Sequence, residues 1–71
     1  MTPDLLREAG EALYGPLWQS ELARALGVAD RTVRRWIAGE RPVPAGLGPT
    51  LRGLLTDHGK AIAAVRRKLP R

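Results

Sequence analysis

Apolar residues recur at intervals of three and four along most of this chain, which is the spacing of one face of an α-helix. The first such face consists of Leu5, Leu6, Ala9, Ala12 and Leu13. Thr2 is suited to cap this helix, Pro3 suits its first position, and Gly15-Pro16 suits its end. The pattern therefore predicts a first helix that ends just before residue 15.

Two shorter amphipathic segments follow, over about residues 17–26 and 30–38. Their predicted inward positions are Leu22, Ala23, Leu26, Val33, Trp36 and Ile37. Gly27 falls between the two segments, where a tight turn requires a positive φ that glycine adopts at little cost. Gly39 ends the later segment, and Pro42 and Pro44 prevent its continuation. The pattern predicts two short helices joined by a glycine turn.

The C-terminal third follows a predicted loop over residues 40–47, and Gly48-Pro49 resembles a helix start. Its apolar positions alternate spacings of four and three: Leu51, Leu55, His58, Ile62, Val65 and Leu69. Gly53 and Gly59 weaken a helix, so the pattern fits either one long bent helix or a break near His58-Gly59. Without a strand pattern or an internal repeat, the predicted fold is all-α, a compact bundle of four to five helices in one domain over residues 1–71.

Composition narrows the class of protein. The chain has 71 residues and no cysteine, which excludes disulfides and thiolate metal sites. No hydrophobic stretch approaches the ~20 residues that span a bilayer, and there is no signal-peptide pattern. We therefore expect a cytoplasmic protein that does not associate with membranes.

Charge is distributed unevenly along the chain, whose net charge is +5. Residues 1–28 carry four carboxylates and two arginines, a net charge of −2, whereas residues 29–71 carry ten Lys or Arg and three carboxylates, a net charge of +7. Ten of the twelve cations are arginine, which suits forked recognition of phosphates and guanine. The basic half indicates a nucleic-acid partner.

Residues that could support catalysis or hold a metal are not arranged for either role. There is no Ser/His/Asp set, no carboxylate pair beside a base and no phosphate-cradling glycine loop, and the single histidine, His58, suits a structural or solvent-facing position. We expect no enzyme activity, no metal and no cofactor. A chain this short also leaves no room for a sensor pocket beside a binding fold, so we expect no small-molecule ligand.

The run from Gln19 to Pro42 resembles the Cro and lambda-repressor-like helix-turn-helix family, the xenobiotic-response-element type of regulator. The matching residues are Gln19-Ser20-Glu21-Leu22-Ala23, Leu26-Gly27-Val28, Thr32-Val33, Trp36, Gly39 and Pro42. The resemblance implies a helix-turn-helix core of Leu22, Ala23, Gly27, Val33 and Trp36, in which Ala23 is small because the helices cross closely there. It covers residues 19 to about 44 strongly and the flanking helices loosely.

The same resemblance implies which residues contact double-stranded DNA. The base-reading positions are Asp30, Arg31 and Arg35, and arginine commonly donates two hydrogen bonds to guanine. Asp30 has a second interpretation as a helix cap, because the family's usual Ser or Thr cap is replaced by Ala29. Arg34 lies off the reading face, which favours phosphate contact or solvation.

Phosphate contacts are expected from Gln19, Thr32, Arg34 and Arg41. For Thr32, contact with a thymine methyl group and simple exposure to solvent are alternatives. Gln19 matches the family's phosphate-contacting position, but Trp18 replaces the Thr cap that usually precedes it. If Pro16 is already helical, Gln19 lies a turn inside the helix and the contact moves. Trp18 is then either a core anchor or an indole N–H donor to phosphate.

A single helix-turn-helix reads too few base pairs for useful specificity, so we expect a homodimer on a pseudo-palindromic site. The candidate interface lies on residues 50–69, at Leu55, Ile62, Val65 and Leu69. The same stripe could instead pack on the chain's own first helix, or divide between the two roles.

The resulting hypothesis is a small autorepressor, bacterial or phage-encoded and nucleoid-associated. Two alternatives stay open. One is an antitoxin or adaptor that uses the helix pair as a scaffold for protein binding. The other is a basic RNA-binding module, although Tyr14 is the only Phe or Tyr and no aromatic stacking platform is evident.

Overall fold

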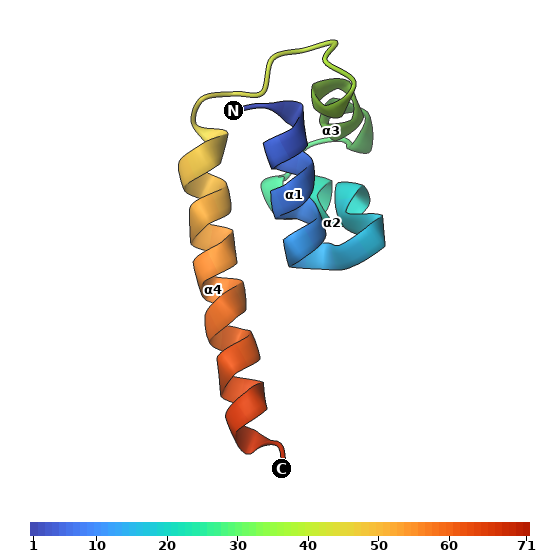
Figure 1. Ribbon diagram of the computed structural model, residues 1–71. Coiled ribbons are helices and arrows are strands. Elements are labelled where there is room, and N and C mark those ends of the chain that lie inside the picture. Colours follow the sequence, from blue (N-terminus) through green and yellow to red (C-terminus); the bar gives the residue numbers. More distant parts are fainter.

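The computed structural model describes all residues from 1 to 71, and its regular structure is entirely helical (Figure 1). Four α-helices and one 3₁₀ turn follow in the order α1 (Pro3–Tyr14), η1 (Gly15–Leu17), α2 (Trp18–Leu26), α3 (Asp30–Ile37) and α4 (Leu47–Lys68). The predicted all-α class is confirmed.

Helix α1 begins and ends where its sequence predicts. The hydroxyl of Thr2 accepts a hydrogen bond from the backbone N–H of Leu5 at 3.1 Å, and Pro3 takes the first helical position. Gly15 ends the helix with φ +73°, and the chain turns through η1 directly into α2. Because η1 is so short, α1 and α2 pack against each other.

Helices α2 and α3 both end on a glycine in a positive-φ conformation. At Gly27 (φ +71°) the next residue, Val28, donates its N–H to the carbonyl of Ala23 at 3.0 Å. At Gly39 (φ +77°) Glu40 donates to the carbonyl of Arg35 at 3.0 Å. This is the Schellman closure, which satisfies carbonyls in the last turn of a helix. It gives each of these short helices a defined end.

The core is apolar throughout and contains no buried charged or polar side chain. It consists of Leu6, Leu13, Trp18, Leu22, Ala23, Val33, Trp36, Leu47 and Leu51. These residues come from all four α-helices, so the first half of the chain and the start of α4 form one packed unit.

The predicted inward face of α1 is too wide. Leu6 and Leu13 are buried, but Leu5 and Ala12 are exposed. Helix α1 directs Leu6, Gly10 and Leu13 into the molecule. Leu5 and Ala12 precede these buried positions by one residue, and the neighbouring helices leave them uncovered.

Gly10 allows α1 and the start of α2 to approach closely. A Cβ atom at Gly10 would lie 2.0 Å from Cε3 of the Trp18 ring. The Trp18 side chain is 4 % exposed. Trp18 is therefore a core anchor.

Helix α4 is continuous over its 22 residues, without the break that Gly53 and Gly59 made possible. It begins at Leu47, slightly before the predicted start at Gly48-Pro49. Its first half lies along α1, where Leu47 and Leu51 are buried and the ring of His58 meets that of Tyr14 edge-on at 6.1 Å. Its second half extends beyond the other helices (Figure 1). The molecule is consequently elongated, 46 × 21 × 21 Å.

Candidate nucleic-acid interface

Helix α3 has a buried side and a basic side. Val33 and Trp36 are buried against the rest of the molecule. Arg31 and Arg34 are exposed, and Arg35 is half-buried. A helix of eight residues thus presents three guanidinium groups around its solvent-facing half.

These arginines have no carboxylate partner in the chain. The two ion pairs of the structure join Asp4 to Arg7 and Glu21 to Arg24, both within single helices. Arginines without an internal partner keep their hydrogen-bond donors available to a ligand. The uncompensated charge on α3 is therefore suited to an external anion.

Asp30 does not cap α3, so that part of its interpretation is wrong. The N-cap residue is Ala29, and no side chain caps the helix. Instead, Asp30 is the first helical residue, and one of its carboxylate oxygens accepts a hydrogen bond from the Ser20 hydroxyl at 3.0 Å. A carboxylate there is also favoured by the positive end of the helix dipole.

The contact with Ser20 was not predicted from the sequence. It joins the first turn of α2 to the first residue of α3, across the intervening turn. Only the folded arrangement reveals it, because the two residues are ten positions apart. It holds the Asp30 carboxylate at the start of α3.

Gln19 is the second residue of α2 and is half-buried. The preceding η1 turn changes this helix start, because the N–H of Trp18 already donates to the carbonyl of Gly15. Leu17 provides no side-chain cap. Gln19 is thus near the start of α2 itself, but the 3₁₀ turn that contains Pro16 comes directly before that helix.

Thr32 and Arg41 lie at opposite ends of the α3 region. Thr32 is half-buried in the first turn of α3. Arg41 is exposed and follows the helix, with its backbone N–H donating to the carbonyl of Arg35 at 3.3 Å. That hydrogen bond holds Arg41 beside the C-terminal end of α3. The basic surface therefore continues past the helix itself.

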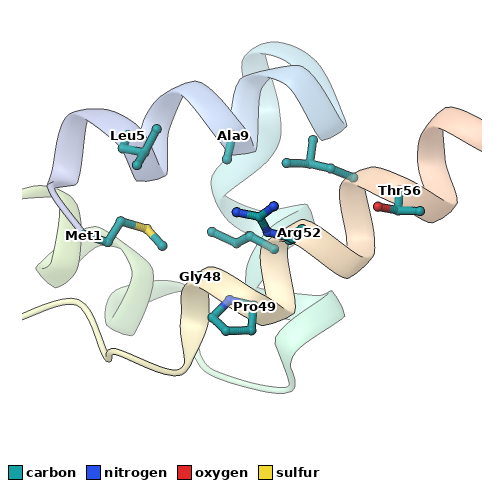
Figure 2. A pocket seen from close by; sticks show the side chains of 9 residues that line it. Met1, Leu5, Ala9, Gly48, Pro49, Arg52 and Thr56 are labelled. Carbon is teal, nitrogen blue, oxygen red and sulfur yellow. The ribbon is translucent and has the colours of Figure 1, made fainter.

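A separate groove lies between α1 and α4, and no residue of α2 or α3 lines it (Figure 2). Its volume is about 640 Å³. It is lined by Met1, Leu5, Ala9, Gly48, Pro49, Leu51, Arg52, Leu55 and Thr56. Leu55, predicted as a pairing position, therefore borders this groove. The groove holds a single charged residue, Arg52, at its lining.

Two further features bear on function. No three or more His, Cys, Asp or Glu side chains gather where they could hold a metal ion. None of the helices combines the length and the apolar character required to cross a membrane.

The assignment of function depends on the residues and their arrangement, because comparison of this chain with known proteins finds no match. No protein-family model, no curated protein and no solved structure matches this chain.

Proposed function

We propose that this chain is a sequence-specific double-stranded DNA-binding regulator, in which α2 and α3 act as a helix-turn-helix. The observation that carries the proposal is the division of α3 into a buried apolar side and a side with three arginines that have no carboxylate partner. In this arrangement α2 packs against α3, and α3 enters the major groove.

The size of α3 suits that position. Its eight residues span about 12 Å at 1.5 Å per residue, and the major groove is about 12 Å wide. Short helices of this length place their side chains on a few adjacent base pairs. The Schellman closure at Gly39 gives the reading helix a defined C-terminal end, and the closure at Gly27 gives α2 a defined end before the turn into α3.

We assign base reading to Arg31, Arg35 and Asp30. Arginine donates two parallel hydrogen bonds to O6 and N7 of guanine, and an aspartate accepts from the amino group of cytosine. Arg31 is exposed in the first turn, and the half-buried stem of Arg35 allows its guanidinium to reach outward. The Ser20 hydrogen bond leaves the second oxygen of Asp30 available for a base.

Phosphate contacts are assigned to Gln19, Thr32, Arg34 and Arg41. They flank the base-reading residues on α2, on α3 and in the loop after α3. Contacts of this kind fix the position of a protein on the duplex without reading sequence. They also make affinity depend strongly on salt.

The proposed biological role is that of a small homodimeric autorepressor that reads a pseudo-palindromic operator. Two copies are required because one reading helix contacts too few base pairs to discriminate among competing genomic sites. In this proposal the protein's own concentration controls occupancy of the operator.

The proposal is tested by selecting bound duplexes from a random pool and measuring their affinity by fluorescence anisotropy. We expect a recurring half-site, present twice in inverted orientation, and binding at least about 10³-fold tighter than to scrambled DNA in moderate salt. Equal affinity for selected and scrambled duplexes would overturn sequence-specific regulation. Preference for an RNA competitor over duplex DNA would favour the RNA-binding alternative.

A further inference from the structure

The second half of α4 carries an apolar stripe that nothing in the chain covers. Ile62, Val65 and Leu69 are 56 %, 55 % and 64 % exposed, and together with Ala61 and Arg66 they border a shallow depression. The stripe continues the four-and-three spacing of Leu51 and His58, which lie against α1. The stripe therefore lies on the same face of α4 that packs against α1. This face is uncovered where α4 extends past the end of α1 (Figure 1).

We infer that a second copy of this chain covers the stripe, with the two α4 helices antiparallel. The inference adds to the proposed function the way in which the two DNA-binding units of a dimer are joined. It rests on the proposed function only for the requirement that there are two such units. The stripe is self-complementary in this orientation, because Ile62 then lies opposite the partner's Val65 and Leu69 opposite the partner's His58. Ala61, at the edge of the stripe, is small, so the helices can approach closely there.

Charge selects the antiparallel orientation. The end of the chain carries Arg66, Arg67, Lys68 and Arg71, none of which forms an ion pair. Parallel helices would bring eight positive charges together at one end, whereas antiparallel helices place these charges at opposite ends. Each basic end then lies level with the other copy's Asp57 and with the end of α1, which belongs to the segment with net charge −2. Opposite charges favour that approach, and like charges disfavour the parallel one.

The extent of the stripe sets the expected strength. Residues 58 to 69 cover about 17 Å of helix at 1.5 Å per residue, which is short for an interface. Stable interfaces bury about 1,200 Å² or more, and smaller ones belong to weaker complexes. We therefore expect a dissociation constant in the micromolar range, about −8 kcal/mol.

Sedimentation equilibrium without DNA tests the pairing. Over about 1 to 100 μM, on both sides of a micromolar dissociation constant, we expect the wild type to change from monomer to dimer. Ile62→Lys should weaken association at least about tenfold, because it places a charge in the paired stripe. Ala63→Lys is the matched control, because Ala63 is exposed on the other side of the same helical turn, and it should associate like the wild type.

Two results would overturn the inference. One is a wild-type chain that stays monomeric at all these concentrations, which is also the outcome if another protein covers the stripe. The other is equal weakening by the two lysine substitutions. Because DNA is absent, neither result measures sequence-specific binding, which the selection from random duplexes tests separately. A dimer that fails to bind DNA would refute the proposed function instead.

Disulfide trapping tests the orientation, since the chain has no cysteine of its own. Leu69→Cys and His58→Cys chains, with different tags, are mixed and oxidised. The antiparallel arrangement predicts a cross-link between the two variants and little Leu69→Cys homodimer. A dominant Leu69→Cys homodimer would show parallel helices and overturn the inference. Circular dichroism of each variant checks that the helices are retained.

Discussion

At the scale of single residues, the close approach of Gly10 to Trp18 determines how the first two helices pack. The Trp18 ring occupies the space that any Cβ at position 10 would need. Glycine inside a helix costs roughly 1 kcal/mol relative to alanine, so its presence there needs a packing reason. In the sequence, the only indication of this contact is a glycine at position 10 inside a predicted helix. Only the structure identifies Trp18 as the neighbour.

We predict opposite effects for the same substitution at two glycines. Gly10→Ala should destabilise the protein by about 1–3 kcal/mol or more, because the ring of Trp18 and the helices have to shift. Gly53→Ala should stabilise it by about 0.5–1 kcal/mol, because Gly53 is exposed in α4 and nothing lies near its missing Cβ. Urea unfolding at one fixed protein concentration measures both. If Gly10→Ala is as stable as the wild type, the packing contact between Gly10 and Trp18 is refuted.

The arginines are predicted to differ in what they contribute to DNA binding. Arg31→Ala and Arg35→Ala should each relax the preference at one base pair of a half-site, by about 1–3 kcal/mol of discrimination. Arg41→Ala should weaken binding to all sequences alike and reduce the slope of log affinity against log salt by about one. Anisotropy titrations on the selected site and on its single-base variants give both quantities.

Arg7→Ala is the matched control for these variants, because Arg7 lies on α1 and is paired with Asp4. It should leave discrimination unchanged. If Arg31, Arg35 and Arg41 variants all lose affinity uniformly across sequences, the base-reading assignment is incorrect.

At the scale of helices and turns, sequence pattern and structure agree best where a residue type has one physical role. Thr2, Gly15 and Gly27 each mark a helix boundary correctly, since a capping hydroxyl or a positive φ is a local requirement. The α1 face was predicted less well. Its apolar residues span more of the helix than its neighbours cover, and which side stays open depends on where α4 lies.

The candidate site divides in the same way. Helical periodicity was sufficient to predict that Val33 and Trp36 point inward and that Arg31 and Arg34 point outward. The Ser20–Asp30 hydrogen bond, the η1 turn before Gln19 and the groove between α1 and α4 depend on contacts between distant parts of the chain. Periodicity within one segment carries no information about such contacts.

The turn between α2 and α3 gives a prediction at this scale. Gly27→Ala should destabilise the protein by about 1–2 kcal/mol, because a Cβ in the left-handed region is strained even where space is open. Gly27→Asn should cost less, since asparagine tolerates that region. Thermal unfolding compares the two. Equal stability of wild type and Gly27→Ala would show that the turn relaxes to another conformation.

At the scale of the whole molecule, the chain divides into a packed head and a protruding helix. The head contains the core and the proposed reading helix, and the second half of α4 contributes no buried residue. The isolated second half of α4 is too short to be a stable helix in water by itself. Continuity with the first half, anchored on α1 by Leu47 and Leu51, supports it.

The unbroken course of α4 makes it a spacer of fixed length. In the antiparallel pair, Leu51 and its equivalent lie about 38 Å apart along the helix axis, at 1.5 Å per residue from a midpoint between Ile62 and Val65. One turn of B-DNA is about 34 Å, which is close to this separation of the two Leu51 positions. In the proposed dimer, the length of α4 would set the spacing between operator half-sites, and the reading residues would set only the half-site sequence.

Changing that length should change which DNA is bound without changing the half-site. Eleven residues inserted between His58 and Ala61 add about three helical turns, so the apolar stripe stays on one face, and they move the heads apart by about 33 Å, or about one further turn of B-DNA. Repeating the selection from random duplexes with this variant should return the same half-sites at a wider separation. Recovery of the original spacing would show that α4 does not set it.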